Sequence, residues 1–465
     1  MLESWMGQLR GRTMSRRSLV IAVASIAVVS LLVVVVGAAT RWFGLAGSSA
    51  AEAPPPVLRL APLRPDAPAP GKSGLAAALT KLAGSSDLGT LTGMVADPAS
   101  GEVLWSRNPD KAMPPGSTTK LLTCAAALLT LSPTTRIPTR VVAGSTPDSV
   151  VLVGGGDPTL SALDKDSESV YPGAAKLDSL AEEVRYAHPG PIHTVTVDIG
   201  RFTGEGMAPG WDTSDIAGGN ITPIGPLILD GGRSKPDELD PPRTATPALD
   251  AGKALAQRLG ADPATVAVGS APTGAAVLGE VGSPPVADLV ETTLRISDNV
   301  LAESLARQVA LARGVDPSFA GAAGAVRDSL AAAGFDVSGV STVDGSGLST
   351  EDRVPARLLG QILTAASGPA SDQRAARLRP LVTGLSVAGG DGTLDDRFTD
   401  DASAGRGFVR AKTGTLTGVS ALAGVVSDSD GRLLSFAFLA SGTSPAVARP
   451  RLDALAAALR ECGCR

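Results

Sequence analysis

A serine and a lysine three residues apart are the first residues in this chain that could do chemistry together. They lie in the run Ser117-Thr118-Thr119-Lys120, directly after Pro114-Pro115-Gly116. If a helix starts here, the spacing puts both side chains on one face, about 5–6 Å apart at Cβ. A lysine can take the proton of a hydroxyl once burial or a second cation has lowered its pKa. The run predicts a serine nucleophile with a lysine base; the alternative is that Ser117 only caps the helix.

A second lysine stands in the run Lys412-Thr413-Gly414-Thr415, inside a predicted strand at 408–416. A lysine and a threonine that point from a sheet edge into a cleft can bind a carboxylate. Gly414 would let a substrate approach the backbone closely, so that a neighbouring N–H can help to form an oxyanion hole. The alternative is an ordinary lysine on a surface strand.

The third run is Ser297-Asp298-Asn299, which we place in a helical stretch at 290–306. Ser297 would supply a hydroxyl for proton transfer, and Asn299 an amide that holds the backbone of a substrate. A competing match, Ser106-Arg107-Asn108, precedes the nucleophile helix and has the pattern of a strand end and turn. The order along the chain therefore favours Ser297.

Taken in order, S-x-x-K, S-x-N and K-T-G make the pattern of penicillin-binding proteins and serine β-lactamases. Four longer stretches resemble the class C low-molecular-mass penicillin-binding proteins, which are D-alanyl-D-alanine carboxypeptidases/endopeptidases. The resemblance covers the chain from about Leu75 to the C-terminus. The four stretches are 152–158 (LVGGGDP), 344–349 (DGSGLS), 388–394 (AGGDGTL) and 410–418 (RAKTGTLTG).

This resemblance implies an α+β fold. It implies a β-lactamase/transpeptidase-like domain, in which a five-stranded antiparallel sheet lies beside a helical cluster, with one or two mainly β domains inserted. The 176 residues between Lys120 and Ser297 leave ample room for such an insertion.

The resemblance also implies a role for each motif residue. Ser117 attacks the carbonyl of the penultimate D-Ala, and Lys120 takes its proton. Ser297 relays a proton to the leaving group, and Asn299 holds the acyl side. Lys412 and Thr413 bind the terminal carboxylate, while Gly414 admits the substrate and the N–H groups of Ser117 and Thr415 form the oxyanion hole.

The implied substrates are the D-Ala-D-Ala ends or cross-links of peptidoglycan stem peptides, and β-lactams are expected as covalent inhibitors. Two departures from the family concern the side chain of the stem peptide. Thr350 stands where the family often has a basic residue, with Arg353 three residues on. Asp212 or Asp215 could face the substrate amine, although solvated acids in a loop are the simpler explanation.

Composition limits the other classes of partner. The chain has 465 residues, 43% of them hydrophobic, and a net charge of -5, so we expect no nucleic acid. Two histidines and three cysteines offer too few ligands for a metal site, and we expect no cofactor. Cys124 is predicted to be a buried thiol; a bridge from it to Cys462 or Cys464 is left open.

The N-terminal region has the pattern of a membrane segment. Residues 19–39 form an uncharged run long enough to span a bilayer, with four arginines before it and Arg41 alone just after. This charge bias places the rest of the chain outside the cytoplasm. A cleaved signal peptide is the alternative, because Gly37, Ala38 and Ala39 resemble a cleavage site.

The predicted organisation follows from these features. A basic tail (1–18) precedes the anchor (19–39) and a Pro/Ala-rich linker (40–72). The transpeptidase-like domain is split into 73–137 and 286–465 around the inserted module 138–285. Within it we expect helices at 75–82, 117–131, 287–313, 318–334, 355–366 and 445–460, and strands at 90–96, 103–106, 408–416, 420–427 and 433–441.

Two rival functions remain compatible with the motifs. A serine β-lactamase would need a group that deacylates rapidly, often a glutamate that positions a water, and no residue can be assigned to it. A wall-binding scaffold on a retired peptidase fold would be expected to have lost at least one motif residue. Gly154-Gly155-Gly156 does not predict a phosphate loop, because no G-K-[ST] follows it.

Overall fold

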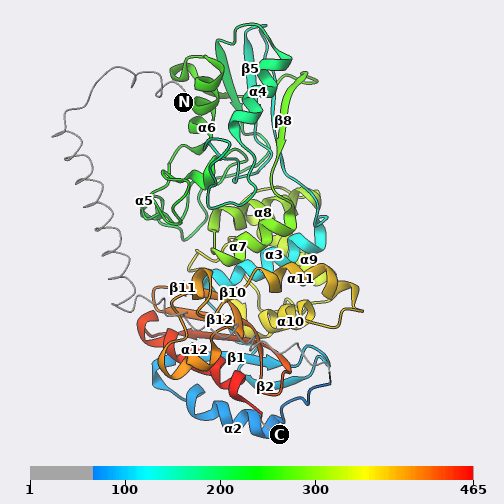
Figure 1. Cartoon of the computed structure of the whole chain (residues 1–465), viewed down its shortest axis with the longest axis vertical. Coiled ribbons are helices and arrows are strands. Elements are labelled where there is room, and N and C mark those ends of the chain that lie inside the picture. Colours follow the sequence, from blue (N-terminus) through cyan, green and yellow to red (C-terminus); the bar gives the residue numbers. More distant parts are fainter. Residues whose placement is uncertain (1–65, 464–465) are drawn as a thin grey trace, which may run out of the picture. The chain divides into compact units, whose positions relative to one another are not determined.

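The computed structural model describes residues 66–463, and its largest sheet is built from both ends of this range (Figure 1). Six strands run in the order β10-β11-β12-β13-β1-β2, and every neighbouring pair is antiparallel. The predicted five strands are present, and the two-residue β10 adds a sixth at the edge. The strands are β1 (Thr90–Ala96), β2 (Val103–Arg107), β10 (Ser386–Val387), β11 (Val409–Leu416), β12 (Val419–Ser427) and β13 (Leu433–Ser441).

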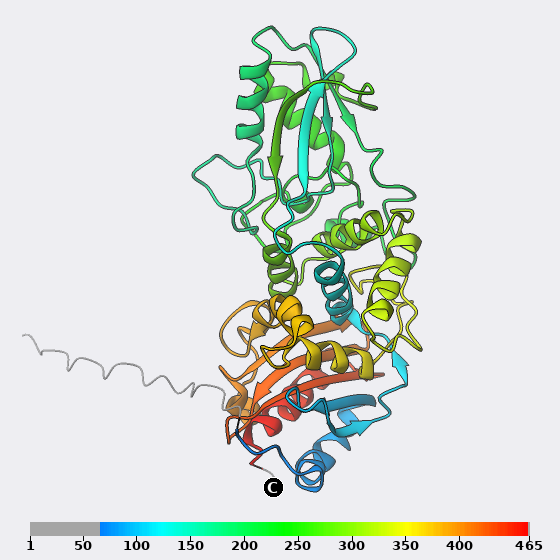
Figure 2. The same ribbon diagram turned by 90° about the vertical axis from the view of Figure 1, so that its right-hand side faces the viewer.

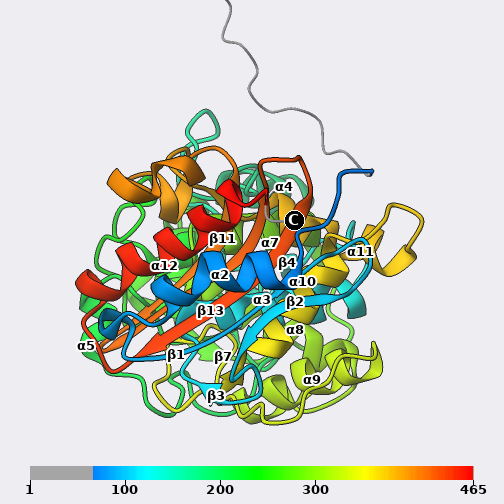
Figure 3. The same cartoon turned by 90° about the horizontal axis from the view of Figure 1, so that it is seen from below.

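One face of this sheet is covered by α2 (Lys72–Ala83) and α12 (Pro445–Glu461), which cross it side by side in Figure 3. Successive side chains of a strand point to opposite faces. In β13, Phe436 and Phe438 accordingly pack with α2 and α12, whereas Ala437 and Leu439 belong to the core on the other face. The sheet is therefore buried on both sides.

A cluster of helices covers the other face, with the nucleophile helix near its centre. α3 (Thr119–Thr130) buries ten of its twelve residues, as expected for a helix surrounded by others. Figures 1 and 2 show this cluster next to the sheet. Its other members are α7 (Val286–Arg295), α8 (Asn299–Ala312), α9 (Phe319–Ala332), α10 (Ala356–Ala366) and α11 (Gln373–Thr383).

The single helix expected at 287–313 was wrong, because the chain breaks between α7 and α8. Ser297 has a φ of 58°. This value lies in the left-handed region, which a right-handed helix cannot include, so the helix must end there. Asp298 then caps α8, since its side chain accepts a hydrogen bond from the Leu301 N–H. The S-x-N motif therefore lies in a turn and at a helix start.

The residues between α3 and α7 form a second sheet, ordered β7-β6-β5-β4-β8. We call residues 138–285 the insert. β5 pairs in parallel with β6, and β6 with β7, so each connection needs a crossover, which α4 and α6 provide. The sequence did not predict these two helices. The elements are β4 (Pro138–Ala143), β5 (Ser149–Val153), β6 (Thr194–Asp198), β7 (Ala267–Gly269), β8 (Val277–Gly282), α4 (Leu177–Ala187), α5 (Ser214–Ala217) and α6 (Pro247–Leu259).

The mixed fold with a β-rich insert confirms the predicted fold class; the domain limits at 138 and 285 stay a prediction. A small ladder of β3 (Ala112–Met113) and β9 (Val354–Pro355) completes the strands of the described residues. Cys124 is a buried free thiol, so the bridge to the C-terminal cysteines that the sequence left open is not formed.

The predicted membrane segment at 19–39 lies outside the described residues, as do the basic tail and most of the linker. Among residues 66–463, no helix combines the length and the apolar character that crossing a bilayer requires.

Candidate active site

Ser117 lies in a tight turn that is pressed against β11. The turn is a short 3-10 helix, Gly116–Thr118, which leads directly into α3. A Cβ placed on Gly116 would lie 2.8 Å from the Thr415 backbone nitrogen, and one on Gly414 would lie 2.3 Å from the Pro115 oxygen. Real Cβ atoms do not approach so closely, so both glycines are needed to bring Ser117 up to the K-T-G strand.

Lys120 is the second residue of α3, one turn after Ser117, and is fully buried. Its Nζ donates to Ser117 Oγ at 2.9 Å, to Asn299 Oδ1 at 2.6 Å and to the Ser346 carbonyl oxygen at 2.8 Å. An ammonium group has three protons to donate, so each has a partner. All three acceptors are uncharged.

Burial lowers the pKa of Lys120 to about 8, although the charges of Asp344 and Asp298 oppose the shift. A buried ammonium loses its hydration, and uncharged acceptors replace only part of it. Roughly a tenth of the lysine is then neutral at pH 7, far more than for a lysine in water. The amine can therefore accept a proton from the hydroxyl that it contacts.

Lys412 is also fully buried, on β11. Burial, together with the charge of Lys120, holds the pKa of Lys412 well below its usual range. Its Nζ donates to the Thr413 carbonyl at 2.9 Å. Thr413 Oγ1 donates to Thr393 Oγ1 at 3.0 Å, so the 388–394 stretch lies against the K-T-G strand. The effect of the Lys120 charge on the pKa of Lys412 shows that the two lysines lie near one another.

The three residues of the S-x-N motif are placed differently. Asn299 reaches Lys120, and its Nδ2 donates to the Asn220 carbonyl at 2.9 Å. Ser297 is half-buried in the turn before α8, and within residues 66–463 no hydrogen bond joins its Oγ to Ser117, Lys120 or Lys412. The structure therefore brings Ser117, Lys120 and Asn299 into contact and leaves the Ser297 hydroxyl outside that contact.

The turn at 344–349 contributes a residue that the motifs did not predict. A Cβ on Gly347 would lie 2.0 Å from the Gly116 oxygen, so the turn packs directly on the Ser117 turn. Asp344 holds it by accepting the N–H groups of Gly347 at 2.7 Å and Ser349 at 2.7 Å. The carbonyl of Ser346 is thereby aimed at Lys120. The D-G-S-G-L-S run was part of the family resemblance, but nothing in it indicated this backbone contact.

Two further side chains complete the surroundings of these motifs. Arg449 of α12 donates to Thr415 Oγ1 at 2.9 Å. Trp211 of the insert donates to Asp344 Oδ2 at 2.8 Å and packs edge-on against Phe319, with ring centroids 5.2 Å apart. A long-range partner of this kind has no signal in a single sequence.

The residues expected near the stem-peptide side chain have local partners in the structure. Asp212 accepts the Ser214 N–H at 2.8 Å, and Asp215 accepts Asn220 Nδ2 at 3.0 Å. Arg353 donates to the Thr350 carbonyl at 2.8 Å. Through Asn220, Asp215 is thus two hydrogen bonds from Asn299. Which of these groups faces a substrate stays a prediction.

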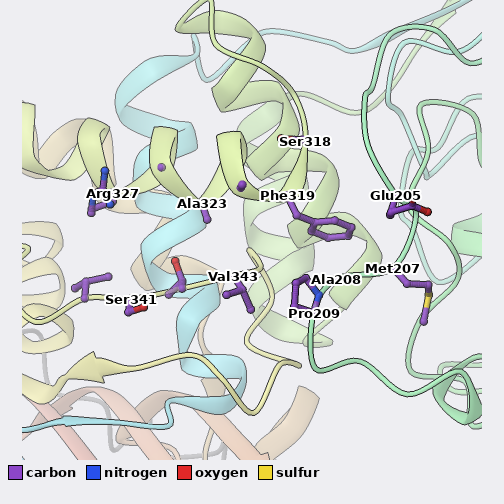
Figure 4. A pocket seen from close by; sticks show the side chains of 14 residues that line it. Glu205, Met207, Ala208, Pro209, Ser318, Phe319, Ala323, Arg327, Ser341 and Val343 are labelled. Carbon is purple, nitrogen blue, oxygen red and sulfur yellow. The ribbon is translucent and has the colours of Figure 1, made fainter.

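A cavity of about 750 Å³ lies apart from these motifs. Figure 4 shows Phe319 and Ala323 of α9 on one side of it and Ser341 and Val343 on the other. Its lining includes none of the predicted site residues. It borders the segments that carry Trp211 and Asp344 and is not itself the centre of the chemistry.

The fold and the contact between Ser117 and the buried Lys120 define the class first: this is an active-site serine hydrolase of the penicillin-binding type. The model of the D-Ala-D-Ala carboxypeptidase 3 (S13) family matches residues 75–241 and 234–462, which is most of the chain. The chain belongs to this family, and it is a serine-type D-Ala-D-Ala carboxypeptidase. The predicted family and enzyme class are confirmed, and the β-lactamase and scaffold alternatives are not favoured.

Individual proteins support the same assignment. The chain is 45% identical over 460 residues to carboxypeptidase DacB of Mycolicibacterium smegmatis, covering 97% of this chain and 98% of that protein. It is 31% identical over 448 residues to the D-alanyl-D-alanine carboxypeptidase of Actinomadura sp. strain R39, covering 80% and 82%. Since this family acts on peptidoglycan, the catalytic region works outside the cytoplasm.

The fold is shared with penicillin binding protein 4 (dacB) from Haemophilus influenzae. Its crystal structure matches with a TM-score of 0.66 and 21% identity, over 80% of this chain and 98% of that one. A second structure of that protein, complexed with a novel β-lactam, matches with a TM-score of 0.59.

Proposed function

We propose that the chain cleaves the D-Ala-D-Ala ends or cross-links of peptidoglycan through an acyl-enzyme on Ser117. Ser117 Oγ attacks the carbonyl carbon of the penultimate D-Ala, and its proton passes to Lys120. The C–N bond breaks, and the leaving amine takes up the proton from Lys120 by way of the Ser297 hydroxyl. Water then hydrolyses the ester and returns the hydroxyl to Ser117.

The observation that carries this proposal is the 2.9 Å contact between Ser117 Oγ, which is half-buried, and the Nζ of Lys120, which is fully buried. A general base must lie within hydrogen-bond reach of the proton that it abstracts, and its pKa should lie near the working pH. Lys120 meets both conditions, because burial brings its pKa to about 8. The proposed roles of the other residues depend on this pair.

Substrate binding is assigned to the K-T-G strand. Lys412 and Thr413 bind the terminal carboxylate, and Gly414 lets the substrate lie close to β11. The close approach of Gly116 to the Thr415 nitrogen supports an oxyanion hole formed by the N–H groups of Ser117 and Thr415. Asn299 holds the acyl side of the peptide while it supports Lys120.

Carboxypeptidase and endopeptidase activity share the acylation step and differ in the amine that leaves. A free D-Ala leaves in the first reaction, and the amine of a neighbouring stem peptide leaves in the second. A β-lactam would acylate Ser117 in the same way, but its ring-opened leaving group stays attached. We therefore expect β-lactams to inhibit the enzyme covalently.

We also propose that residues 19–39 anchor the enzyme in the membrane, with the linker at 40–72 holding the catalytic region away from it. The support is the uncharged run and the arginine bias before it. Extraction of cell membranes with sodium carbonate, followed by intact-mass measurement, tests this. An anchored chain stays with the membrane at full length; a soluble chain shortened after residue 39 contradicts the anchor.

The catalytic proposal is tested by incubating the full chain with pentapeptide and with cross-linked peptide dimer, followed by mass spectrometry. A penicillin should add its mass to one peptide that contains Ser117, and Ser117→Ala should abolish both labelling and hydrolysis. Sustained turnover of a chromogenic cephalosporin, in place of a stoichiometric burst, would identify a β-lactamase instead.

The two candidate S-x-N motifs give a matched control. Ser297→Ala should slow the cleavage of the terminal D-Ala from the peptide. Ser106→Ala, at an exposed position in the competing motif, should leave the cleavage rate unchanged. Equal effects of the two variants would contradict the role of Ser297.

A further inference from the structure

The turn that precedes α8 holds an unusual backbone conformation in the middle of the site. Ser297 has a φ of 58°, in the left-handed region that is unfavourable for a residue with a side chain. A strained conformation persists only where surrounding contacts hold it. Within residues 66–463, Asp298 and Asn299 make six side-chain hydrogen bonds, and four of these end on the insert.

Asp298 is a buried anion that is bound by two guanidinium groups. Its Oδ2 accepts from Arg233 Nη2 at 2.6 Å, from Arg243 Nη2 at 3.3 Å and from Tyr171 OH at 3.0 Å. Both arginines are only 2% exposed, and Asp298 not at all. Burial by itself raises the pKa of Asp298, but Arg233 and Arg243 outweigh it and hold the pKa below its usual range.

The two guanidinium groups are themselves fixed by backbone oxygens. Arg233 donates to the Leu239 carbonyl at 3.0 Å, and Arg243 donates to the carbonyls of Gly219 at 2.8 Å and Gly231 at 2.6 Å. An arginine fork held at several points loses little freedom when it binds a carboxylate. The insert therefore presents a rigid receptor to Asp298.

Asn299, the next residue, is oriented from the same side. Its Nδ2 donates to the Asn220 carbonyl, so its other end, Oδ1, must be the atom that faces Lys120. If the amide turned over, an N–H donor would face the ammonium group and a carbonyl would face a carbonyl. The insert thus sets which atom of Asn299 meets the base.

We propose that Arg233 and Arg243 are positioning residues of the catalytic centre, which hold Asp298 so that Asn299 stays on Lys120. The insert is then a working part of the active site and not only an addition to it. This inference rests on the proposed function of Ser117 and Lys120, because acylation is its readout. It assigns no contact with substrate to either arginine.

The test measures acylation of the full chain by a fluorescent penicillin, with the rate constant and the labelled fraction recorded separately. Arg233→Lys keeps the charge and removes the fork, so we expect the rate constant to fall about 10- to 100-fold. The labelled fraction should stay near that of the unaltered protein. If the fraction falls while the rate constant of the labelled part is unchanged, Arg233 only supports folding and the proposal is overturned.

A matched control is Arg258, which pairs with Asp178 within the insert, away from the S-x-N turn. Arg258→Lys should leave the acylation rate constant within about twofold, since a loss of stability alone changes the labelled fraction. An equal fall in Arg258→Lys and Arg233→Lys would also overturn the proposal.

The pH dependence supplies a readout that a structural role would not change. The titratable groups facing Lys120 besides Asp298 are Asp344, Glu303, Cys124 and, from β11, Lys412. Asp298 raises the pKa of Lys120, so Asp298→Asn should shift the rise of acylation to lower pH. Asparagine still caps α8. Arg233→Met removes a positive charge and should shift the rise to higher pH.

Opposite shifts support the proposal, and an unmoved profile in both variants contradicts it. Failure of the proposed function has a different appearance. In that case the unaltered protein is not labelled, or Ser117→Ala is labelled as well, whatever residue stands at 233.

Discussion

Two buried ionisable side chains lie close together in this protein, and their hydrogen-bond partners differ in charge. Asp298, at the start of α8, is bound by two arginines and a tyrosine from the insert. Lys120, on the adjacent α3, is bound by a hydroxyl, an amide oxygen and a carbonyl oxygen. Both side chains are almost or fully inaccessible to water, so the difference lies in their partners.

The difference shows how burial makes one group inert and the other reactive. A buried ion whose charge is compensated keeps that charge over the working pH range, as Asp298 does next to Arg233 and Arg243. A buried ion with neutral partners gives up its charge more easily, and the pKa of Lys120 falls to about 8. The first arrangement suits a fixed anchor, and the second suits a base.

Two buried acids next to Asp344 fit the same comparison. Burial, reinforced by Asp344, raises the pKa of Glu303 and of Asp352 well above the usual range of a carboxyl group. These two acids are therefore mostly protonated at neutral pH. Glu303 in particular lies near Lys120 without supplying the full negative charge that would keep the lysine protonated.

The largest effect is expected when Lys120 is replaced by a cation that cannot lose its proton. Lys120→Arg should reduce acylation by penicillin about 10²- to 10⁴-fold, the range typical for loss of a general base. In the unaltered protein the rate should rise about tenfold per pH unit up to about pH 8, because only the neutral amine accepts the proton. The rate constant measured between pH 5.5 and 9 checks both statements.

Lys111→Arg, at an exposed position, is the matched control and should acylate normally. A Lys120→Arg enzyme that acylates at a comparable rate, with the same rise toward pH 8, would show that some other group is the base.

A smaller effect, on stability, is expected at the buried acids. Asp352 has a raised pKa in the folded state, so at pH 8 the folded protein holds a proton that the unfolded chain has lost, and stability falls as pH rises. Asp352→Asn cannot ionise. Its melting temperature relative to the unaltered protein should therefore be higher at pH 8 than at pH 4, by roughly 2–6 °C.

Differential scanning fluorimetry at the two pH values measures this, with Asp401→Asn as an exposed control that should show no such dependence. A difference between Asp352→Asn and the unaltered protein that is the same at pH 4 and pH 8 would argue against a protonated Asp352.

The smallest effect is expected at an exposed ion pair close to the arginine receptor. Lys235 and Glu238 are 2.6 Å apart, but their side chains are 64% and 52% exposed. Water and salt screen such a pair, so Glu238→Gln should move the melting temperature by less than about 1 °C and leave acylation unchanged. A loss of activity in this variant would mean that the loop around Arg233 is sensitive to any change. The effect of Arg233→Lys could then not be assigned to the guanidinium group.

Much of the fold could be predicted because its signals are local. The strands 90–96 and 433–441 were predicted with the limits of β1 and β13, since apolar runs between turn residues define them. The helices α4 and α6 were missed among short β-branched runs. The break between α7 and α8 was missed. Asp298 can cap α8 only because Ser297 leaves the helical conformation, and the helix propensity of Ser297 does not indicate this.

For the candidate site, the motifs predicted which side chains meet but not what surrounds them. Ser117, Lys120 and Asn299 were all named from the sequence, and they are in contact. The Ser346 carbonyl was not named, because every residue has a backbone oxygen and the sequence does not indicate which one faces Lys120. The Ser297 hydroxyl was expected near the same centre; among residues 66–463 no hydrogen bond joins it to either lysine, and its role in proton transfer stays a prediction.

The sequence by itself determined the kinds of chemical group, their spacing on α3 and β11, and the order that places the chain among active-site serine enzymes. Only the tertiary structure decided the charge states. Whether a buried lysine is a base or a carboxylate is an anchor depends on water exclusion and on partners up to 226 residues away along the chain, and neither is a property of a short motif.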